Sequence, residues 1–475
     1  MKIYLKNNDE TYAVLDMVRL YIPEEKIEFV YDKPLEEDFI SVSVDKKDDM
    51  YFYETKISYF KKSASYSFVK NEYSKFNIKL CLLKMLDDFF MMHPPWGILT
   101  GIRPSKNVIE MIKEGKTFEK AKNILKDEYF VDEKKANLAI NVAKSENEIL
   151  KGFDKNKISL YIGIPFCPSR CLYCSFISQS IGFSSRLVKP YLNALYKEIE
   201  ETAHLIKGKE IETVYIGGGT PTTLSADELK ELIKKLYSTF DLSKIKEFTV
   251  EAGRPDTITK EKLEVLKDLS VTRISINPQT MNDKTLKLIG RNHTADDIIE
   301  KFNLAREVGF NHINMDLIVG LPGETTKDFE YTLSEIEKLN PESITVHSLS
   351  VKRGSYLDEK YSKGEITKNE HANKMIDLAV EKMEKMGKIP YYMYRQKNTA
   401  GNLENVGFCS VGHECLYNIY IMQEIQSIIS LGAGGSTKIV TDKSIERVFN
   451  VKEVSEYINR IDEMIERKRK LIGMI

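Results

Sequence analysis

Six apolar segments with the character of β-strands recur between residues 160 and 351, separated by stretches of helical periodicity. They read LYIGIPF, TVYIGGGTP, EFTVEAG, TRISINPQ, HINMDLIVGLPG and SITVHSLSV. The expected helices cover Leu187–Ile206, Ala226–Thr239, Lys260–Leu269, Asp283–Ile289, Ala295–Val308 and Thr326–Leu339. This alternation predicts parallel β/α units with right-handed crossovers. In such sheets and barrels the chemistry lies at the carboxyl ends of the strands.

Three of the six cysteines follow the first of these segments, in YIGIPFCPSRCLYCSF. Cys167, Cys171 and Cys174 have C-x3-C-x2-C spacing, and thiolates this close together suit an iron–sulfur cluster or zinc. A cubane cluster held by three cysteines keeps one iron open for another ligand. A structural zinc site would need a fourth ligand and commonly uses paired C-x2-C units. Inert buried cysteines are the other alternative.

Further polar or glycine-rich positions fall at the ends of the later strands. Glycine in Gly217–Thr220 lets backbone groups approach a ligand closely. The Glu251 carboxylate can accept both hydroxyls of a ribose, and Arg291 can form charge-assisted bonds with a carboxylate. Gln279 offers a donor and an acceptor, and Asp316 could bind a hydroxyl or an amine. The recurrence of such residues at strand ends predicts one shared site.

The cysteine spacing and the GGGTP element resemble the radical S-adenosylmethionine (radical SAM) superfamily. The resemblance implies an α/β fold, a partial (β/α)6 barrel with an N-terminal α+β domain and a C-terminal extension. It also implies a [4Fe-4S] cluster on Cys167, Cys171 and Cys174 whose open iron chelates SAM. An electron from the cluster would cleave SAM to methionine and a 5′-deoxyadenosyl radical.

A narrower resemblance rests on YIGIPFCPSRCLYCSF, IGGGTPTTL, VEAGRPDTIT, RISINPQTMND, IGRNHT and NMDLIVGLPGET. Together these look like the oxygen-independent coproporphyrinogen III oxidase group, and the resemblance covers residues 158–360. GIRPSK and LGAGGSTK are similar to the longer coproporphyrinogen dehydrogenase subgroup. The resemblance implies that SAM is contacted by Tyr161, Tyr173, Gly218, Gly219, Thr220, Glu251, Gln279, Arg291 and Asp316.

The reaction implied by this group is oxidative decarboxylation of two propionates of coproporphyrinogen III, which gives protoporphyrinogen IX. It implies a tetrapyrrole substrate, one or two bound SAM molecules, and a low-potential electron donor such as flavodoxin or ferredoxin. Two positions depart from the group: Gly163 replaces the usual His, and Phe176 replaces the usual fourth Cys, which is not a cluster ligand. Two alternatives stay open, a radical SAM-like haem chaperone and a radical SAM enzyme acting on another tetrapyrrole.

The rest of the chain predicts two flanking regions, so that the expected domains are 1–155, 156–365 and 366–475. In the first, strands are expected at MKIYLK, KIEFVYD, DFISVSVD and MYFYETKISYF, with helices over 74–92 and within 105–152. The last should contain a helix over 366–386, strands at IPYYMYRQKN and SIISLGAGGSTKIV, and a terminal amphipathic helix with a solvated face. Cys409, His413 and Cys415 could bind a metal or haem iron, although core or loop packing is the default interpretation.

Composition limits the remaining functions. The chain has 70 basic and 71 acidic residues, and this balance argues against a nucleic-acid-binding protein, which needs a basic excess. The N-terminus lacks the pattern of a signal peptide, and no stretch reaches the ~18 apolar residues of a membrane span. Few cysteines in a long chain favour a reducing compartment. We therefore expect a cytoplasmic, monomeric protein.

Overall fold

The computed structural model describes residues 1–22, 26–32, 38–101, 103–174, 179–350, 355, 357, 370–396 and 399–473. The chain divides into two compact units, Met1–Ile140 and Asn141–Ile475. The division falls within helix α5 (Glu133–Ile149). The three domains expected from the sequence, 1–155, 156–365 and 366–475, stay a prediction. None of the described helices is long and apolar enough to cross a membrane.

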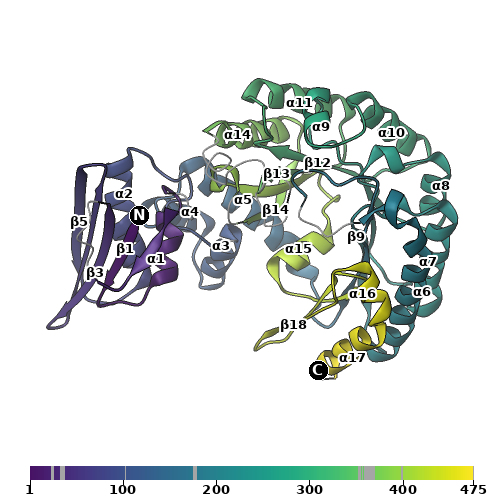
Figure 1. Ribbon diagram of the computed structural model, residues 1–475, viewed down its shortest axis with the longest axis horizontal. Coiled ribbons are helices and arrows are strands. Elements are labelled where there is room, and N and C mark those ends of the chain that lie inside the picture. Colours follow the sequence, from purple (N-terminus) through teal and green to yellow (C-terminus); the bar gives the residue numbers. More distant parts are fainter. Residues whose placement is uncertain are drawn as a thin grey trace. The chain divides into compact units, whose positions relative to one another are not determined.

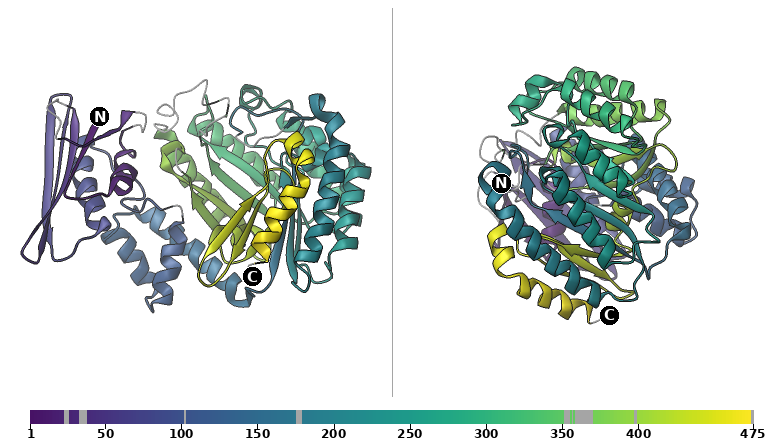
Figure 2. Two further views of the ribbon diagram at one scale, coloured as in Figure 1. Left: turned by 60° about the horizontal axis from the view of Figure 1, so that its bottom comes forward. Right: turned by 90° about the vertical axis from the view of Figure 1, so that its right-hand side faces the viewer.

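The first unit is built on a five-stranded sheet in the order β2-β1-β3-β4-β5. Its strands are β1 (Lys2–Lys6), β2 (Glu28–Val30), β3 (Phe39–Lys47), β4 (Met50–Tyr59) and β5 (Lys62–Lys70). The four predicted strands are confirmed, whereas β5 and α1 (Thr11–Val18) were not expected. Helices α1 and α2 (Lys75–Phe90) cover one face of the sheet (Figure 2). Ile3, Val42, Ile78 and Leu82 are among the residues buried between them.

Two short helices complete the first unit, α3 (Pro104–Lys113) and α4 (Phe118–Asp127). Pro104 begins α3 because proline fits the first turn of a helix, where its missing N–H costs nothing. The Thr117 side chain accepts a hydrogen bond from the Lys120 amide and so caps α4. The helices predicted between 105 and 152 are therefore present as α3, α4 and α5.

The second unit contains an eleven-stranded sheet in the order β14-β15-β13-β12-β11-β10-β9-β6-β16-β17-β18 (Figure 1). Its parallel strands are β6 (Ile158–Ile164), β9 (Ile211–Gly218), β10 (Glu247–Glu251), β11 (Arg273–Ser275), β12 (Ile313–Val319) and β13 (Ser343–Ser348). These are the six predicted strands, and each lies beside the next along the chain. The six predicted strands are therefore confirmed, and the structure adds their order in the sheet.

Helices cover the outer face of these parallel strands (Figure 1). They are α6 (Ile181–Leu205), α7 (Ala226–Thr239), α8 (Lys260–Asp268), α9 (Asp283–Leu288), α10 (Ala295–Glu307) and α11 (Thr326–Leu339). Capping boxes at Ser225, Thr294 and Thr325 explain why α7, α10 and α11 begin where the sequence predicts. With inward-facing strand residues opposite, this is the partial (β/α)6 barrel that the sequence led us to expect.

The C-terminal region extends both edges of the barrel sheet. Strand β15 (Glu404–Cys409) runs antiparallel to β13, and β14 (Ile389–Arg395) pairs with β15. On the other edge β16 (Ser427–Leu431) adds a seventh parallel strand beside β6, followed by antiparallel β17 (Ser436–Val440) and β18 (Ile445–Phe449). The strand over SIISLGAGGSTKIV, expected to be broken by its glycines, forms two strands, β16 and β17, joined by a glycine turn. Helix α14 (Glu370–Lys385) and helix α15 (Leu416–Gln423) complete this region; residues 366–369 of the predicted 366–386 helix lie outside the described residues.

The C-terminal segment forms two helices, α16 (Val454–Asn459) and α17 (Ile461–Ile472), rather than one. Both pack against α6 (Figure 2). The expected helix, packed on one side and solvated on the other, is present in α17. Lys468 lies on the packed side, where it is only 1% exposed and donates to Glu198 of α6 at 2.6 Å. Glu198 also accepts hydrogen bonds from Tyr457 and Asn450. A buried ion pair, absent from any local pattern, therefore joins the chain end to the barrel.

Candidate functional site

The three cysteines of the C-x3-C-x2-C motif line one cavity of about 180 Å³ at the carboxyl end of β6. Cys167 lies in the short strand β7 (Phe166–Cys167), which pairs with β8 (Gln179–Ser180). The same cavity is lined by Tyr173, Gly218, Gly219, Thr220, Glu251, Arg291 and Asp316. Ten of the twelve predicted cluster and SAM residues thus come together from five loops or strand ends. Phe176 lies outside the described residues.

The glycine-rich turn at the end of β9 packs directly on the cysteine loop. Gly219 N donates to Ile164 O, and Thr220 N donates to Phe166 O, each at 2.7 Å. A Cβ on Gly219 would lie 2.5 Å from Phe166 O and 3.0 Å from Cys167 Sγ, and one on Gly217 would lie 3.0 Å from the Glu251 carboxylate. Gly218 has φ +112°, which side-chain-bearing residues rarely adopt. The motif is a cradle that any side chain would fill.

Cationic and hydroxyl groups surround the thiols. Arg254 Nη1 lies 3.5 Å from Cys171 Sγ and also 3.5 Å from Ser169 O, while Arg254 Nη2 donates to Ser169 Oγ at 3.1 Å. The Asp256 carboxylate receives two hydrogen bonds from the same guanidinium. Thr220 Oγ1 lies 3.5 Å from Cys167 Sγ. Three cysteine sulfurs around one cavity form a soft donor set, which fits an iron–sulfur cluster.

Throughout the described ranges, no three His, Cys, Asp or Glu side chains converge on a point where one metal ion could bind. A cubane cluster takes one cysteine per iron, so its ligands surround a group larger than one metal ion, as the three cysteines surround their cavity. The set Cys409, His413 and Cys415 is likewise not assembled; both cysteines are buried, and burial raises the pKa of their thiols.

Glu251 is anchored at the boundary between the glycine turn and the barrel interior. Tyr215 OH donates to Glu251 Oε1 at 2.7 Å, and Gly218 N donates to Oε2 at 3.3 Å. Burial raises the pKa of Glu251 to about 7, and the nearby charge of Asp316 adds to this rise. At neutral pH this carboxyl can therefore accept or donate a hydrogen bond to a hydroxyl-rich ligand.

Arg291 and Asp316 complete the opposite wall. Arg291 Nη2 donates to Tyr173 OH at 3.2 Å and its Nη1 to Asn277 O at 2.5 Å, while its Nε has no partner among the described residues. Asn277 also accepts from the Asp316 amide at 3.2 Å. Burial alone would raise the pKa of Asp316, but the hydrogen bonds and charge of His347 and Asn314 lower it. The wall thus presents a cation and an anion held in fixed positions by backbone and amide groups.

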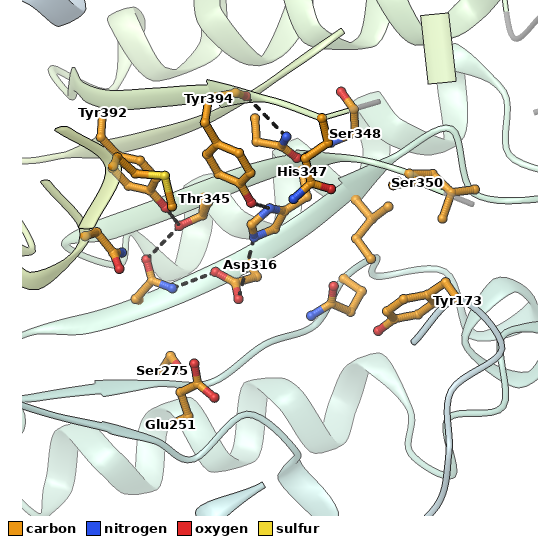
Figure 3. A pocket seen from close by; sticks show the side chains of 18 of the residues that line it. Tyr173, Glu251, Ser275, Asp316, Thr345, His347, Ser348, Ser350, Tyr392 and Tyr394 are labelled. Atoms are coloured by element: carbon orange, nitrogen blue, oxygen red, sulfur yellow. Dashed lines mark hydrogen bonds and ion pairs between the residues drawn. The ribbon is translucent and has the colours of Figure 1, made fainter. Parts of the chain in front are cut away.

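A second, larger cavity of about 360 Å³ continues from this site into the barrel and shares Tyr173, Cys174, Glu251 and Asp316 with it. One group of its side chains, on β12, β13 and β14, is linked by hydrogen bonds that join Tyr392, Thr345, Asn314 and Asp316 (Figure 3). Asn314 Nδ2 donates to Asp316 Oδ1 at 2.7 Å, and the other Asp316 oxygen lies 3.9 Å from His347 Nε2. Tyr394 OH lies 3.4 Å from His347 Nδ1. The cavity thus combines apolar surface with a set of polar groups held in place by hydrogen bonds, as ligand pockets commonly do.

Gln279 and Tyr161 lie apart from the other predicted residues. Gln279 lines only the larger cavity, and its backbone has φ +68° where it forms an isolated bridge to Leu317 of β12. Tyr161 lines neither cavity; its ring stacks on Tyr215 and Tyr417 in the barrel core. Gly163, where the resembling group has His, faces the backbone carbonyls of Leu431 and Ala433 in the β16–β17 turn, 3.4 Å from an added Cβ.

Sequence reasoning missed several residues that line the two cavities, notably Arg254, Arg273, Asn314, His347 and Tyr394. A usable signal was the period of two along a strand. Residues one apart from a strand-end carboxylate lie on opposite faces, but residues two apart share a face. Asn314 precedes Asp316 by two positions, so it could have been predicted to share the inward face of β12 with Asp316. On β13, His347 follows Thr345 by two positions and shares its face in the same way.

Comparison with known proteins agrees with this geometry. Residues 161–336 match the model of the radical SAM superfamily. The structure of coproporphyrinogen III oxidase (HemN) from Escherichia coli shares the fold, with a TM-score of 0.54 over 68% of this chain and 73% of that chain at 23% identity. The heme chaperone HemW of Bacillus subtilis (strain 168) is 35% identical over 64% of this chain and 76% of its own length.

The oxygen-independent coproporphyrinogen-III oxidase-like protein HemZ of Bacillus subtilis (strain 168) is 41% identical over 408 residues, which are 84% of this chain and 81% of the relative. Membership of the radical SAM superfamily implies a [4Fe-4S] cluster and SAM as cofactors. The chain therefore belongs to the oxygen-independent coproporphyrinogen-III oxidase-like family of radical SAM proteins.

Proposed function

We propose that this protein catalyses the oxidative decarboxylation of coproporphyrinogen III to protoporphyrinogen IX with consumption of SAM. The observation that carries the proposal is the continuity of the two cavities. Four residues, Tyr173, Cys174, Glu251 and Asp316, line both the cysteine site and the larger cavity. A substrate in the larger cavity would therefore lie directly against the cofactors, with no intervening wall to cross.

In this reaction each of two propionate arms becomes a vinyl group. The arm loses one hydrogen atom from its β carbon to the cleaved SAM, its carboxylate carbon as CO2, and one electron to an external acceptor. The bound cluster and SAM supply the one-electron chemistry for hydrogen abstraction. A low-potential donor of the flavodoxin or ferredoxin class would deliver the electron that begins each cycle. Two SAM molecules should be consumed per protoporphyrinogen formed, whether one or two are bound at a time.

We propose distinct tasks for the residues of the site. Cys167, Cys171 and Cys174 would hold the cluster, and the backbone of Gly218–Thr220 would hold the amino group of SAM. Arg291, which keeps an unpartnered Nε within the described structure, would pair with the SAM carboxylate. Glu251, already hydrogen-bonded by Tyr215, would accept the ribose hydroxyls.

The remaining predicted contacts differ in where they lie. Tyr173, Gln279 and Asp316 line at least one of the two cavities, and we propose that they contact SAM directly. Tyr161 lies behind Tyr215, so we propose that it acts by packing on that ring. These assignments predict that replacing Tyr161 by Phe has a smaller effect on SAM affinity than replacing Glu251 by Gln.

The decisive experiment is anaerobic turnover of reconstituted protein with coproporphyrinogen III, SAM and a reductant. We expect protoporphyrinogen IX, methionine and 5′-deoxyadenosine, and two 5′-deoxyadenosines per product. The combined replacement of Cys167, Cys171 and Cys174 by Ala should abolish both iron loading and SAM cleavage. Cys409→Ala is the matched control, because that buried thiol lines neither cavity. Formation of 5′-deoxyadenosine with coproporphyrinogen left unchanged would refute the substrate assignment.

A second candidate function is haem transfer, favoured by the 35% identity to the heme chaperone HemW over 76% of that protein. It predicts tight, stoichiometric haem binding and little consumption of coproporphyrinogen III. Haem titration followed by absorption spectroscopy distinguishes the two, since a protein that binds no haem is not a haem chaperone. Mass spectrometry of reactions started from haem and from coproporphyrinogen would reveal a third possibility, modification of another tetrapyrrole.

A further inference from the structure

Arg273 is a buried cation in the wall of the larger cavity. It is the first residue of β11 and is 1% exposed. Arg273 and Ser275 stand two positions apart and both line the cavity, because alternate strand residues face the same side. The strand register places Arg273 level with Thr249, in the middle of β10, and one position before β12 begins at Ile313, whereas the cysteine loop follows the carboxyl end of β6. Arg273 therefore lies deeper in the barrel than the strand ends that carry the cysteine site.

Most of the hydrogen-bonding capacity of this guanidinium is unused. An arginine has five N–H donors, yet within the described structure Arg273 donates only from Nε, to His312 Nε2 at 3.2 Å. Its Nη2 is buried and has no partner there. Burial and the charge of Arg273 lower the pKa of His312 to about 2, so His312 is a neutral acceptor and supplies no negative charge.

The charge of Arg273 is also incompletely compensated. It forms no ion pair with any residue that the structure describes. Three carboxylates act on it over longer distances, and each already accepts hydrogen bonds from other groups. Glu247 accepts from Thr249, Cys415 and the Leu416 amide, Glu251 from Tyr215, and Asp316 from Asn314. A buried cation without a direct partner is costly, and natural proteins normally provide it with an anion. Here the open space that Arg273 lines is a ligand cavity.

We propose that Arg273 binds a carboxylate arm of the substrate at the inner end of the cavity. A guanidinium presents parallel N–H donors that match the two oxygens of a carboxylate. Asn314, Thr345 and Asn418 line the same cavity and offer neutral donors and acceptors around it. The identity of the molecule that carries the carboxylate, a tetrapyrrole with propionate arms, rests on the proposed function; the carboxylate site itself does not.

This site assigns different tasks to the arms of one substrate. An arm held by Arg273 lies deeper in the barrel than the strand ends, so a different arm faces Cys174 and Tyr173 at the cysteine site. Arg273 is thus a specificity-determining residue, because it selects tetrapyrroles that keep a free carboxylate away from the reacting arm. Decarboxylation of two arms then requires the substrate to turn in the cavity while another carboxylate takes the place at Arg273.

The test uses coproporphyrin III, the oxidised tetracarboxylate, and its tetramethyl ester, with binding followed by fluorescence quenching. Wild-type protein should bind the acid at least about tenfold more tightly than the ester. Arg273→Met should weaken binding of the acid by about 30-fold or more and leave binding of the ester unchanged. Arg273→Lys should recover part of the loss. The matched control is Arg306→Met, which removes an arginine paired with Glu342 that lines neither cavity.

A wild-type measurement covers the case in which Arg273→Met does not fold. Phenylglyoxal labelling of Arg273, read by peptide mass spectrometry, should be slowed by coproporphyrin III and not by the ester. Equal binding of acid and ester, or unchanged binding by Arg273→Met, or equal labelling with both ligands, overturns the proposal. Turnover assays separate this proposal from the proposed function. If Arg273→Met loses the preference for the acid but wild-type protein shows no turnover, the carboxylate site is supported and the proposed reaction is not. If turnover occurs and does not depend on Arg273, the reaction is supported and the carboxylate site is not.

Discussion

Replacing Gly219 by Ala tests whether the glycine turn sets the position of the cysteine loop. The new Cβ would lie 2.5 Å from Phe166 O and 3.0 Å from Ile164 O. Both carbonyls are fixed by hydrogen bonds at 2.7 Å from the turn itself, so neither can move aside independently. We expect the overpacking to cost about 1–3 kcal/mol. Because Cys167 Sγ lies 3.0 Å from the same Cβ, iron loading should fall as well.

Gly253→Ala is the matched control, because Gly253 lines the same cavity and an added Cβ there would meet only Asn277 Nδ2, at an ordinary 3.5 Å. Its effect should stay within about 0.5 kcal/mol. Stability is measured on cluster-free protein by urea unfolding followed by circular dichroism, and loading by iron per chain after reconstitution. If Gly219→Ala matches wild type in both, or Gly253→Ala is impaired equally, the steric reasoning is wrong.

Three further predictions use other contacts. Arg254→Met should lower the reduction potential of the reconstituted cluster, because it removes a cation beside Cys171, and Asp256→Asn should raise that potential, because it removes the counter-charge of the same cation. Each shift should be on the order of 59 mV, which corresponds to a tenfold change in the equilibrium constant of a one-electron reduction. Shifts of the same sign in an EPR-monitored redox titration would contradict this. Lys468→Met leaves the Glu198 carboxylate buried without its cation and should cost about 3–5 kcal/mol, seen as a lower Tm. Burial raises the pKa of Glu251 from 4.5 to about 7, so the folded state holds a proton that the unfolded state releases at lower pH. Cluster-free protein should therefore lose stability as pH rises from about 4.5 to 7, and Glu251→Gln should remove that loss. If the Tm of Glu251→Gln depends on pH as the Tm of wild type does, this reasoning is wrong.

Local sequence signals predicted the elements that depend on neighbouring residues. The helix over Ala226–Thr239 has the predicted bounds because a capping box and an amphipathic period act within one segment. The hairpin partner β5 was missed because its polar, serine-rich strand gains its place only by pairing with β4. The terminal helix is interrupted at Arg460 and partly buried, since its environment is provided by α6, more than 200 residues earlier in the chain.

The sequence by itself determined the six β/α units, the loop that carries Cys167, Cys171 and Cys174, and the glycine turn that meets it. These follow from periodicity and from residue types whose chemistry is local. Only the tertiary structure decided that β16 lies beside β6, that Arg254 reaches Cys171, and that Arg273 lines a cavity continuous with the cysteine site. Such contacts join segments far apart in the chain, and the register and inward face of each strand must be known before their side chains can be placed.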